Sequence, residues 1–206
     1  MGSIIAIDIA LIPKNYDVIF EYNRRVTSEA KSGFLFDASH RPHITLLQDF
    51  IRAEHIDALA QEISELTEKV DFLAPAAVKG FGRGGHYLDD LWAPSIELQK
   101  TEPLMALHQE VHGRSQRFSQ SQQYSSGLFS EPTNDKCQSY VKNFRSGPSL
   151  EKFCPHITLA IAPEQTLGDY AAGLQWPAEI EMDSLVLAQM GHYCTVGSAY
   201  KEWKHL

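Results

Sequence analysis

The chain has 206 residues, of which 43% are hydrophobic, and its formal net charge at pH 7 is −8. This length suffices for one large domain or two small lobes with a proper core. The acidic balance argues against binding along a long nucleic-acid tract, which needs a basic face. No run approaches the roughly 20 apolar residues of a membrane span, and three cysteines without metal-ligand spacing favour a reducing cytoplasm.

The first third of the chain predicts two strand–helix pairs. Residues 4–12 alternate between apolar and small or polar side chains, as in a strand with one core face. Residues 15–30 have helical spacing, and a short strand is expected at 34–36. A strand at about 42–49 is followed by residues 53–70, whose apolar side chains recur at the spacing of an amphipathic helix.

The middle of the chain predicts a hairpin followed by two helices. Residues 72–82 and 86–98 are expected to be strands around a glycine-rich turn, "GFGRGGH". One helix starts at Pro103 and another covers 137–144. The polar segment 115–127 between them is expected to be a mobile loop, either a lid or spare length.

The last part predicts a strand at about 153–162, a helix near 164–174 and two closing strands, "EIEMDSLVLAQMG" and "HYCTVGSAYKEW". Antiparallel strands with helices gathered on one face indicate an α+β class. We expect a single bilobal domain over residues 1–206, with pseudo-repeats at roughly 1–100 and 101–206. Strand exchange between the two repeats at the termini is left open.

One pentapeptide, Pro-His-Ile-Thr-Leu, occurs twice. Its histidines are His43 and His156, and its threonines are Thr45 and Thr158. Because side chains alternate along a strand, each histidine shares a face with its threonine, and the Ile and Leu point into the core. A slip by one residue would bury the histidine, so the apolar pair fixes the register.

Two such strands related by a pseudo-two-fold axis would face each other across a groove, and this set of groups suits phosphoryl transfer. Imidazole titrates near pH 6.5, so one ring can accept a proton while the other donates one, each transfer contributing about 10²–10⁴-fold. Threonine hydroxyls can bind phosphate oxygens. The sequence contains no persuasive metal cluster, so neither a metal nor a cofactor is expected.

A structural explanation competes with this one. A single His-x-Thr on a strand is more often a satisfied structural histidine than a catalytic one. Packing alone would repeat the Ile and Leu of the pentapeptide, however, without any need to repeat the polar pair. The second copy therefore favours function.

The paired "HIT" tripeptides, each followed by Leu, resemble the two-histidine (2H) phosphoesterase superfamily. Softer matches are "IIAIDIALIP" to its first strand, "DDLWAPSIELQKTEPLMALHQEV" to a strand and helix, and "SLVLAQMG" with "SAYKEW" to its closing strands. The resemblance implies a bilobal fold of two antiparallel sheets with outer helices, related by a pseudo-two-fold axis, with both motifs in the cleft between them.

The same resemblance implies an activity. Members open 2′,3′-cyclic phosphates at RNA ends, cleave or join 2′–5′ linkages, or act on cyclic phosphates of ADP-ribose. By similarity, His43 and His156 are the acid–base pair, and Thr45 and Thr158 hold the phosphate. The resemblance suggests that His156 activates water and His43 protonates the leaving oxygen, with the roles exchanged in the reverse reaction. It also implies a nucleotide or RNA-end substrate and a monomer.

Other residues have weaker claims. Arg83 is a candidate for contacting phosphate and Tyr193 for stacking on a base, although a solvated arginine and a half-buried tyrosine are the commoner cases. Asp8 either touches the groove or caps an edge. His192 is a candidate for bordering the cleft, next to Tyr193. The remaining histidines are expected on the surface or on a helix: His40, His55, His86, His108, His112 and His205.

These observations support one main hypothesis and three alternatives. The main hypothesis is a metal-independent phosphodiesterase that hydrolyses 2′,3′-cyclic phosphate ends of RNA or short nucleotides. The alternatives are a 2′–5′ linkage phosphodiesterase or ligase, a nucleotide-binding module without catalysis, and a structural role for both motifs.

Overall fold

The computed structural model describes residues 2–88, 90–167, 171 and 173–204, with the side chains at positions 83, 84, 86 and 88 outside the description. The strands are β1 Ile4–Pro13, β2 Ile44–Arg52, β3 Ala76–Leu88, β4 Leu91–Leu98, β5 His156–Thr158, β6 Ala162–Pro163, β7 Glu179–Ile180, β8 Met182–Met190 and β9 Val196–Trp203. The α-helices are α1 Asp17–Ala30, α2 Ile56–Thr67, α3 Glu102–Ser115 and α4 Asp135–Asn143. The 3₁₀ turns are η1 Ala53–His55, η2 Gln116–Phe118, η3 Leu150–Lys152, η4 Glu164–Thr166 and η5 His192–Cys194.

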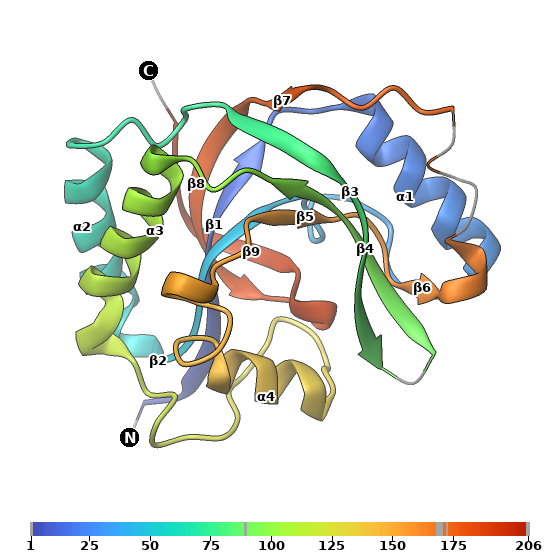
Figure 1. Ribbon diagram of the computed structural model, residues 1–206. Helices are drawn as coiled ribbons and strands as arrows, with labels where there is room; N and C mark the ends of the chain where they lie inside the picture. The colour runs from blue at the N-terminus through green and yellow to red at the C-terminus, as the bar shows by residue number, and fades with distance from the viewer. Residues whose placement is uncertain (1, 89, 168–170, 172, 205–206) are drawn as a thin grey trace.

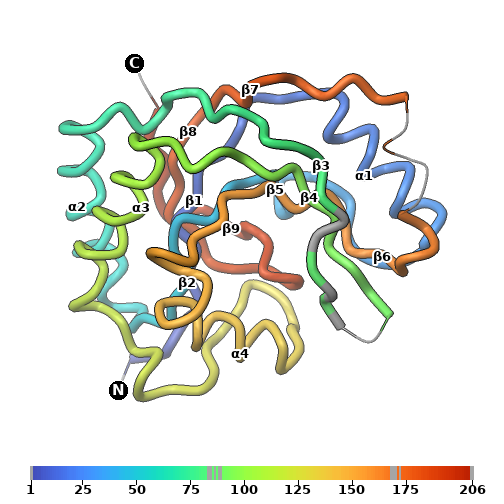
Figure 2. Tube along the Cα trace, viewed as in Figure 1, coloured from blue at the N-terminus to red at the C-terminus, as the bar shows by residue number. Residues whose placement is uncertain are grey.

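The strands form two antiparallel sheets. One has the order β2-β1-β8-β9, and the other has the order β5-β4-β3-β7, with β6 pairing on β4. In Figure 1, α2 and α3 lie side by side on one flank, α1 lies on the opposite flank and α4 lies below the sheets. Figure 2 shows that β1 lies beside the C-terminal strands although the sequence separates them widely. The predicted α+β class with two antiparallel sheets and outer helices is confirmed.

The main hydrophobic core draws on both sheets and on the helices. Along β1, one face enters this core and the opposite face enters two smaller clusters that contain Ala6 and Ala10. The residues of the first face are Ile5, Ile7, Ile9 and Leu11. Asp8 therefore lies between two apolar patches on the second face, as the predicted alternation requires.

Most of the predicted elements are confirmed. Helix α1 lies within the predicted helix at 15–30, and η1 and α2 together cover most of 53–70. Helix α3 begins next to Pro103, α4 covers most of 137–144, and β8 and β9 are the two closing strands. None of the described helices is long and apolar enough to cross a membrane.

The predicted glycine-rich turn is wrong, because β3 runs straight through this stretch and ends at Leu88. Gly82 pairs with Ser95 of β4, and the pairing is irregular just after it. A Cβ atom on Gly82 would lie 2.8 Å from Oε1 of Glu97. Glycine here permits the close approach of a neighbouring side chain within a strand rather than a turn.

The predicted strand at 34–36 is also absent, because the side chain of Asn23 takes the place of a strand partner. Its Nδ2 donates to the carbonyl of Phe34 at 3.0 Å, and the amide of Phe36 donates to its Oδ1 at 2.9 Å. The same Nδ2 donates to the carbonyl of Leu159 at 2.9 Å. The predicted strand at 153–162 is correspondingly interrupted between β5 and β6.

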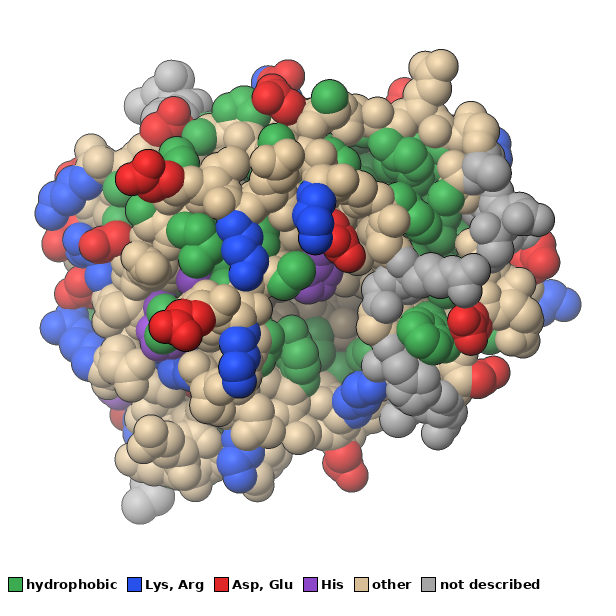
Figure 3. All heavy atoms as spheres, viewed as in Figure 1, with side chains coloured by type: hydrophobic (Ala, Val, Ile, Leu, Met, Phe, Trp, Pro, Cys, Tyr) green, Lys and Arg blue, Asp and Glu red, His purple; other side chains and the backbone are tan. Residues whose placement is uncertain are grey.

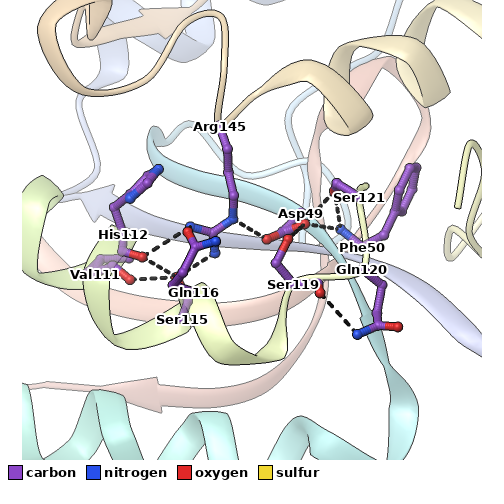
Figure 4. Close-up of polar contacts among 10 residues, drawn as sticks. All are labelled: Asp49, Phe50, Val111, His112, Ser115, Gln116, Ser119, Gln120, Ser121 and Arg145. Atoms are coloured by element: carbon purple, nitrogen blue, oxygen red, sulfur yellow. Dashed lines mark hydrogen bonds and ion pairs between the residues drawn. The ribbon is translucent and has the colours of Figure 1, made fainter. Parts of the chain in front are cut away.

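The polar segment expected to be a mobile loop is fastened to β2. Oδ1 of Asp49 accepts hydrogen bonds from the hydroxyls of Ser119, at 3.0 Å, and Ser121. Its Oδ2 is 2.5 Å from Nε of Arg145, which follows α4 (Figure 4). A buried carboxylate thus ties two connecting segments to one strand.

The predicted helix near 164–174 is only partly tested. The structure has the 3₁₀ turn η4 at its start, and residues 168–170 and 172 lie outside the described part of the chain.

Candidate active site

The first His-x-Thr motif stands at the start of β2, beside β1. Ile44 and Leu46 are fully buried, whereas His43 and Thr45 are only partly buried. The apolar residues therefore anchor the strand and the polar pair lies on the other face, as strand alternation predicts.

A β-bulge follows this motif. Ala10 pairs with Thr45 and Ile9 pairs with Leu47, so Leu46 is an extra residue on β2. Leu46 and Leu47 are both fully buried. Alternation is thereby shifted by one residue, and the side chain of Gln48 lies on the same face of β2 as His43 and Thr45. Bulges are often found beside active sites because they redirect a side chain in this way.

His108 holds the bulge from α3. Its Nδ1 donates to the carbonyl of Leu46 at 2.8 Å, and its Nε2 accepts from the amide of Leu150 at 2.8 Å. Its ring stacks on Phe153 with centroids 3.9 Å apart. Both nitrogens are used by a neutral ring, and burial lowers the pKa of His108. One buried imidazole therefore connects the first motif strand to the segment that leads into the second.

The second motif forms β5, which pairs with β4. His156 lies opposite Glu97, Ile157 opposite Ile96 and Thr158 opposite Ser95. Ile157 is fully buried and both polar residues are partly buried. The second copy thus divides its residues between core and surface in the same way as the first.

Both motif histidines are held by the backbone two residues before them. Nδ1 of His43 lies 2.9 Å from the carbonyl oxygen of Arg41, and Nδ1 of His156 lies 2.8 Å from that of Cys154. A carbonyl accepts only from an N–H, so each Nδ1 carries a hydrogen. The proton that each ring can gain or lose is therefore the one on Nε2.

The structure brings the two motifs together. Strands β2 and β5 contact each other, and the charge of a protonated His156 opposes protonation of His43. Figure 3 shows a hollow in the middle of one face of the molecule, with a patch of histidine atoms at its rim and Lys and Arg side chains nearby. The two imidazoles are therefore near enough for the charge of one to affect the other.

A buried polar set lies under the first motif. Oδ2 of Asp8 accepts from Nε2 of Gln48 at 2.7 Å and from the hydroxyl of Thr45 at 3.4 Å, and it lies 3.8 Å from Nε2 of His43. Burial raises the pKa of Asp8 to about 7, against the two hydrogen bonds, which lower it. Burial likewise lowers the pKa of His43 to about 4, more than the Arg41 carbonyl raises it.

Tyr193 and Arg83, the candidates for contacting a base and a phosphate, can be located to different extents. Tyr193 is partly buried in η5 with a left-handed φ of 58°, and its ring centroid lies 5.5 Å from that of Tyr87. The next residue, Cys194, accepts a hydrogen bond from Gln48 at 3.4 Å, which places η5 beside the first motif. The side chain of Arg83 lies outside the described part of the chain.

Sequence reasoning missed two members of this region. Strict alternation along β2 would place Gln48 on the core face, with Ile44 and Leu46. The bulge shifts the alternation by one residue and brings Gln48 opposite Asp8. His108 was expected among surface or helix histidines, and it lies on a helix but is fully buried. Its spacing from Leu104 and Val111 on the apolar stripe of the helix is the signal that would have found it.

No group of three or more His, Cys, Asp or Glu side chains is arranged to hold a metal ion within the portion of the chain that the structure covers. The polar groups around the two motifs form hydrogen bonds with the backbone and with one another.

A family model described as the 2′-5′ RNA ligase superfamily matches residues 25–191, which include both motifs. The chain belongs to this superfamily. The resemblance to 2H phosphoesterases is confirmed, and membership of the 2′-5′ RNA ligase superfamily supports an enzyme that makes or breaks phosphodiester bonds.

Solved structures of similar fold include Usb1 of Kluyveromyces marxianus, which is 11% identical over 99% of both chains with a TM-score of 0.49. E. coli LigT complexed with ATP is 12% identical over 98% of both chains with a TM-score of 0.49. E. coli LigT complexed with 3′-AMP is 12% identical over 98% of both chains with a TM-score of 0.47. No curated protein sequence matches the chain.

Proposed function

We propose that the protein is a phosphodiesterase that hydrolyses 2′,3′-cyclic phosphates at RNA ends or on short nucleotides without a metal ion. The observation that carries this proposal is the pair of matching motifs, each with an imidazole whose Nδ1 is fixed by a backbone carbonyl and whose Nε2 is left for proton transfer. Membership of a superfamily that works on phosphodiester linkages supports it.

The proposed reaction uses the two rings in opposite protonation states. His156 Nε2 removes a proton from water as the water oxygen attacks phosphorus. His43 Nε2 gives a proton to the ribose oxygen as its bond to phosphorus breaks, and the product is a phosphomonoester. Thr45 and Thr158 donate hydrogen bonds to the non-bridging oxygens, where they stabilise the negative charge of the transition state.

The substrate proposal also draws on charge. A net charge of −8 disfavours contact with a long phosphate backbone, so the substrate is a short nucleotide or a single RNA end. The three cysteines Cys137, Cys154 and Cys194 are all free, which fits the reducing cytoplasm that we propose as the compartment.

A substrate panel tests this proposal. Purified protein is incubated with 2′,3′-cyclic mononucleotides, 2′–5′ and 3′–5′ dinucleotides and the cyclic phosphate of ADP-ribose, with and without EDTA. We expect the cyclic nucleotides to yield phosphomonoesters at the same rate in both conditions. Loss of turnover in EDTA contradicts the metal-independent mechanism.

The description of the superfamily favours one second candidate, a 2′–5′ linkage phosphodiesterase or ligase. Faster cleavage or formation of the 2′–5′ dinucleotide than hydrolysis of any cyclic nucleotide would select it. Calorimetric binding of AMP without turnover of any compound in the panel would instead indicate a nucleotide-binding module.

A further inference from the structure

Asp8 is a buried acid that the mechanism above does not use. It lies in the central strand β1, between the small side chains Ala6 and Ala10 on the same face. Its side chain is 0% exposed. A carboxyl group in such a place is costly unless it is paired or protonated.

The pairing of Asp8 is incomplete. Oδ2 receives all of its polar contacts, from Gln48, Thr45 and His43, while Oδ1 has no partner among the described residues. Asp49 shows what full pairing looks like in the same sheet. It is equally buried, but it binds Arg145 and two serine hydroxyls.

Among the described residues, no lysine or arginine side chain forms an ion pair with Asp8. In the described residues, its ion-pairing neighbour is His43 of β2, and β8 contributes the apolar Ala188 beside it. The charge of Asp8 also contributes to raising the pKa values of Cys194 of η5 and Tyr140 of α4. A hydrogen bond with Cys137, followed by burial, raises the pKa of Cys194, and burial raises that of Tyr140, so both are neutral at pH 7.

His43 offers little compensation for the charge of an ionised Asp8. Burial above all, with smaller effects from the charges of His156 and Arg41, lowers its pKa to about 4, against the hydrogen bond to the Arg41 carbonyl, which raises it. Its ring is therefore neutral at pH 7 until an anion arrives. A bound phosphate group adds the negative charge that favours the imidazolium form.

An ionised Asp8 would compete with that phosphate. Its carboxylate would lie 3.4 Å from the hydroxyl of Thr45 and 3.8 Å from Nε2 of His43, the two groups expected to bind the phosphate. The carboxylate would accept the hydrogen bond of the Thr45 hydroxyl and form an ion pair with a protonated His43. A protonated carboxyl leaves both groups to the ligand.

We propose that Asp8 is a positioning residue that must carry a proton for an anionic phosphate to bind beside His43 and Thr45. This inference rests on the proposed function for the identity of the ligand, but its geometry does not depend on turnover. Binding of the anion is then coupled to the protonation of Asp8, and raising the pH through the midpoint of Asp8 weakens binding.

Wild-type protein provides the first test, by ¹³C NMR of the Asp8 carboxyl carbon during a pH titration. We expect a midpoint near pH 7, as burial predicts. A midpoint below about 5, near the ordinary range of aspartate, overturns the inference. This measurement needs neither a substrate nor a variant.

Binding of sulfate, whose charge is constant from pH 6 to pH 8.5, provides the second test. In the wild type we expect the Kd to rise above pH 7, approaching tenfold per pH unit, as for any ligand that requires one bound proton. Asp8→Asn carries no charge at any pH and should show a smaller rise, which retains only the part that proton uptake by His43 contributes. Asp57→Asn, an exposed change of the same kind on α2, is the matched control and should keep it.

The two proposals fail in different ways. If no cyclic nucleotide is hydrolysed, the proposed function fails, and the titration and sulfate binding still decide the role of Asp8. If hydrolysis occurs, KM should follow the same pH dependence as the Kd for sulfate, while kcat changes less. An unchanged pH dependence in Asp8→Asn, or a kcat lowered equally at every pH, overturns the inference.

Discussion

The two His-x-Thr motifs share five residues but lie in different surroundings. The first stands at the start of a nine-residue strand, next to a bulge and above a buried acid. The second is a three-residue strand, and no ion pair joins His156 to any part of the chain that is described. Both rings nevertheless make the same Nδ1–carbonyl hydrogen bond.

The difference separates what the pentapeptide determines from what its neighbours determine. The local sequence sets the orientation of each ring, because the carbonyl two residues earlier is available in both copies. Burial and nearby charges set how readily each ring holds a proton. The repeated sequence supplies two similar groups, and the proposed function assigns them different roles in their different surroundings.

The largest expected effect comes from removing either imidazole. His43→Ala and His156→Ala should each lower kcat on a 2′,3′-cyclic nucleotide by about 10²–10⁴-fold, the usual contribution of one proton transfer. His55→Ala, in η1 outside the motifs, is the control and should keep its rate. If one motif variant retains full turnover while folded by circular dichroism, that motif is structural and the two are not a catalytic pair.

Removing either hydroxyl should have the next largest effect. Thr45→Val and Thr158→Val are expected to lower kcat by about 10²-fold, the lower end for loss of one transition-state hydrogen-bond donor. The serine variants retain the hydroxyl and should recover most of the rate. Only Thr45→Val should also alter the pH dependence of KM, because only Thr45 contacts Asp8. Equal pH profiles in the two valine variants would contradict this asymmetry.

His108, which connects the two motif segments through its hydrogen bonds, should contribute to the stability of the fold. His108→Phe keeps the stacking on Phe153 but leaves the carbonyl of Leu46 and the amide of Leu150 without partners, at a cost of about 1–3 kcal/mol for such a buried group. Urea denaturation would measure this loss in the free energy of unfolding. His112→Phe, one helical turn away, is the control, since no described residue forms a hydrogen bond with Nε2 of His112. Equal stability of the two variants would argue against the bulge-holding role.

The smallest effect is a dependence of stability on pH. Burial lowers the pKa of His108 and lowers that of His112 to about 4. As the pH falls below about 6.5, these histidines bind protons in the unfolded chain before they do so in the folded one. The free energy of unfolding should therefore fall as the pH drops below about 6.5. It should also fall as the pH rises through about 7, where the buried Asp8, whose pKa is raised, loses its proton in the folded state. Urea midpoints from pH 8 to pH 5 would test this, and the slope should be shallower in His108→Phe.

Much of the fold was predictable because its signals are local. The apolar spacing in α2 and α3 and the alternation along β1 each depend on a few neighbouring residues. The repeated pentapeptide likewise predicted two strands with a polar face, although β5 is shorter than expected.

The features that were not predictable depend on distant partners. At the bulge, the carbonyl of Leu46 accepts a hydrogen bond from His108, which is 62 positions away in the chain. The absent strand at 34–36 reflects the amide of Asn23, and the role of Gln48 depends on the bulge itself. Alternation alone gives Gln48 the wrong face, because a period of two does not anticipate an inserted residue.

The order of strands in the first sheet has a consequence for biosynthesis. On one side β1 pairs with β2, but on its other side it pairs with β8, which the ribosome makes much later. Throughout translation of the intervening chain, an apolar strand therefore has one open edge, and such edges promote association between molecules. A transcript truncated before β8 should yield aggregates even though it encodes both motifs.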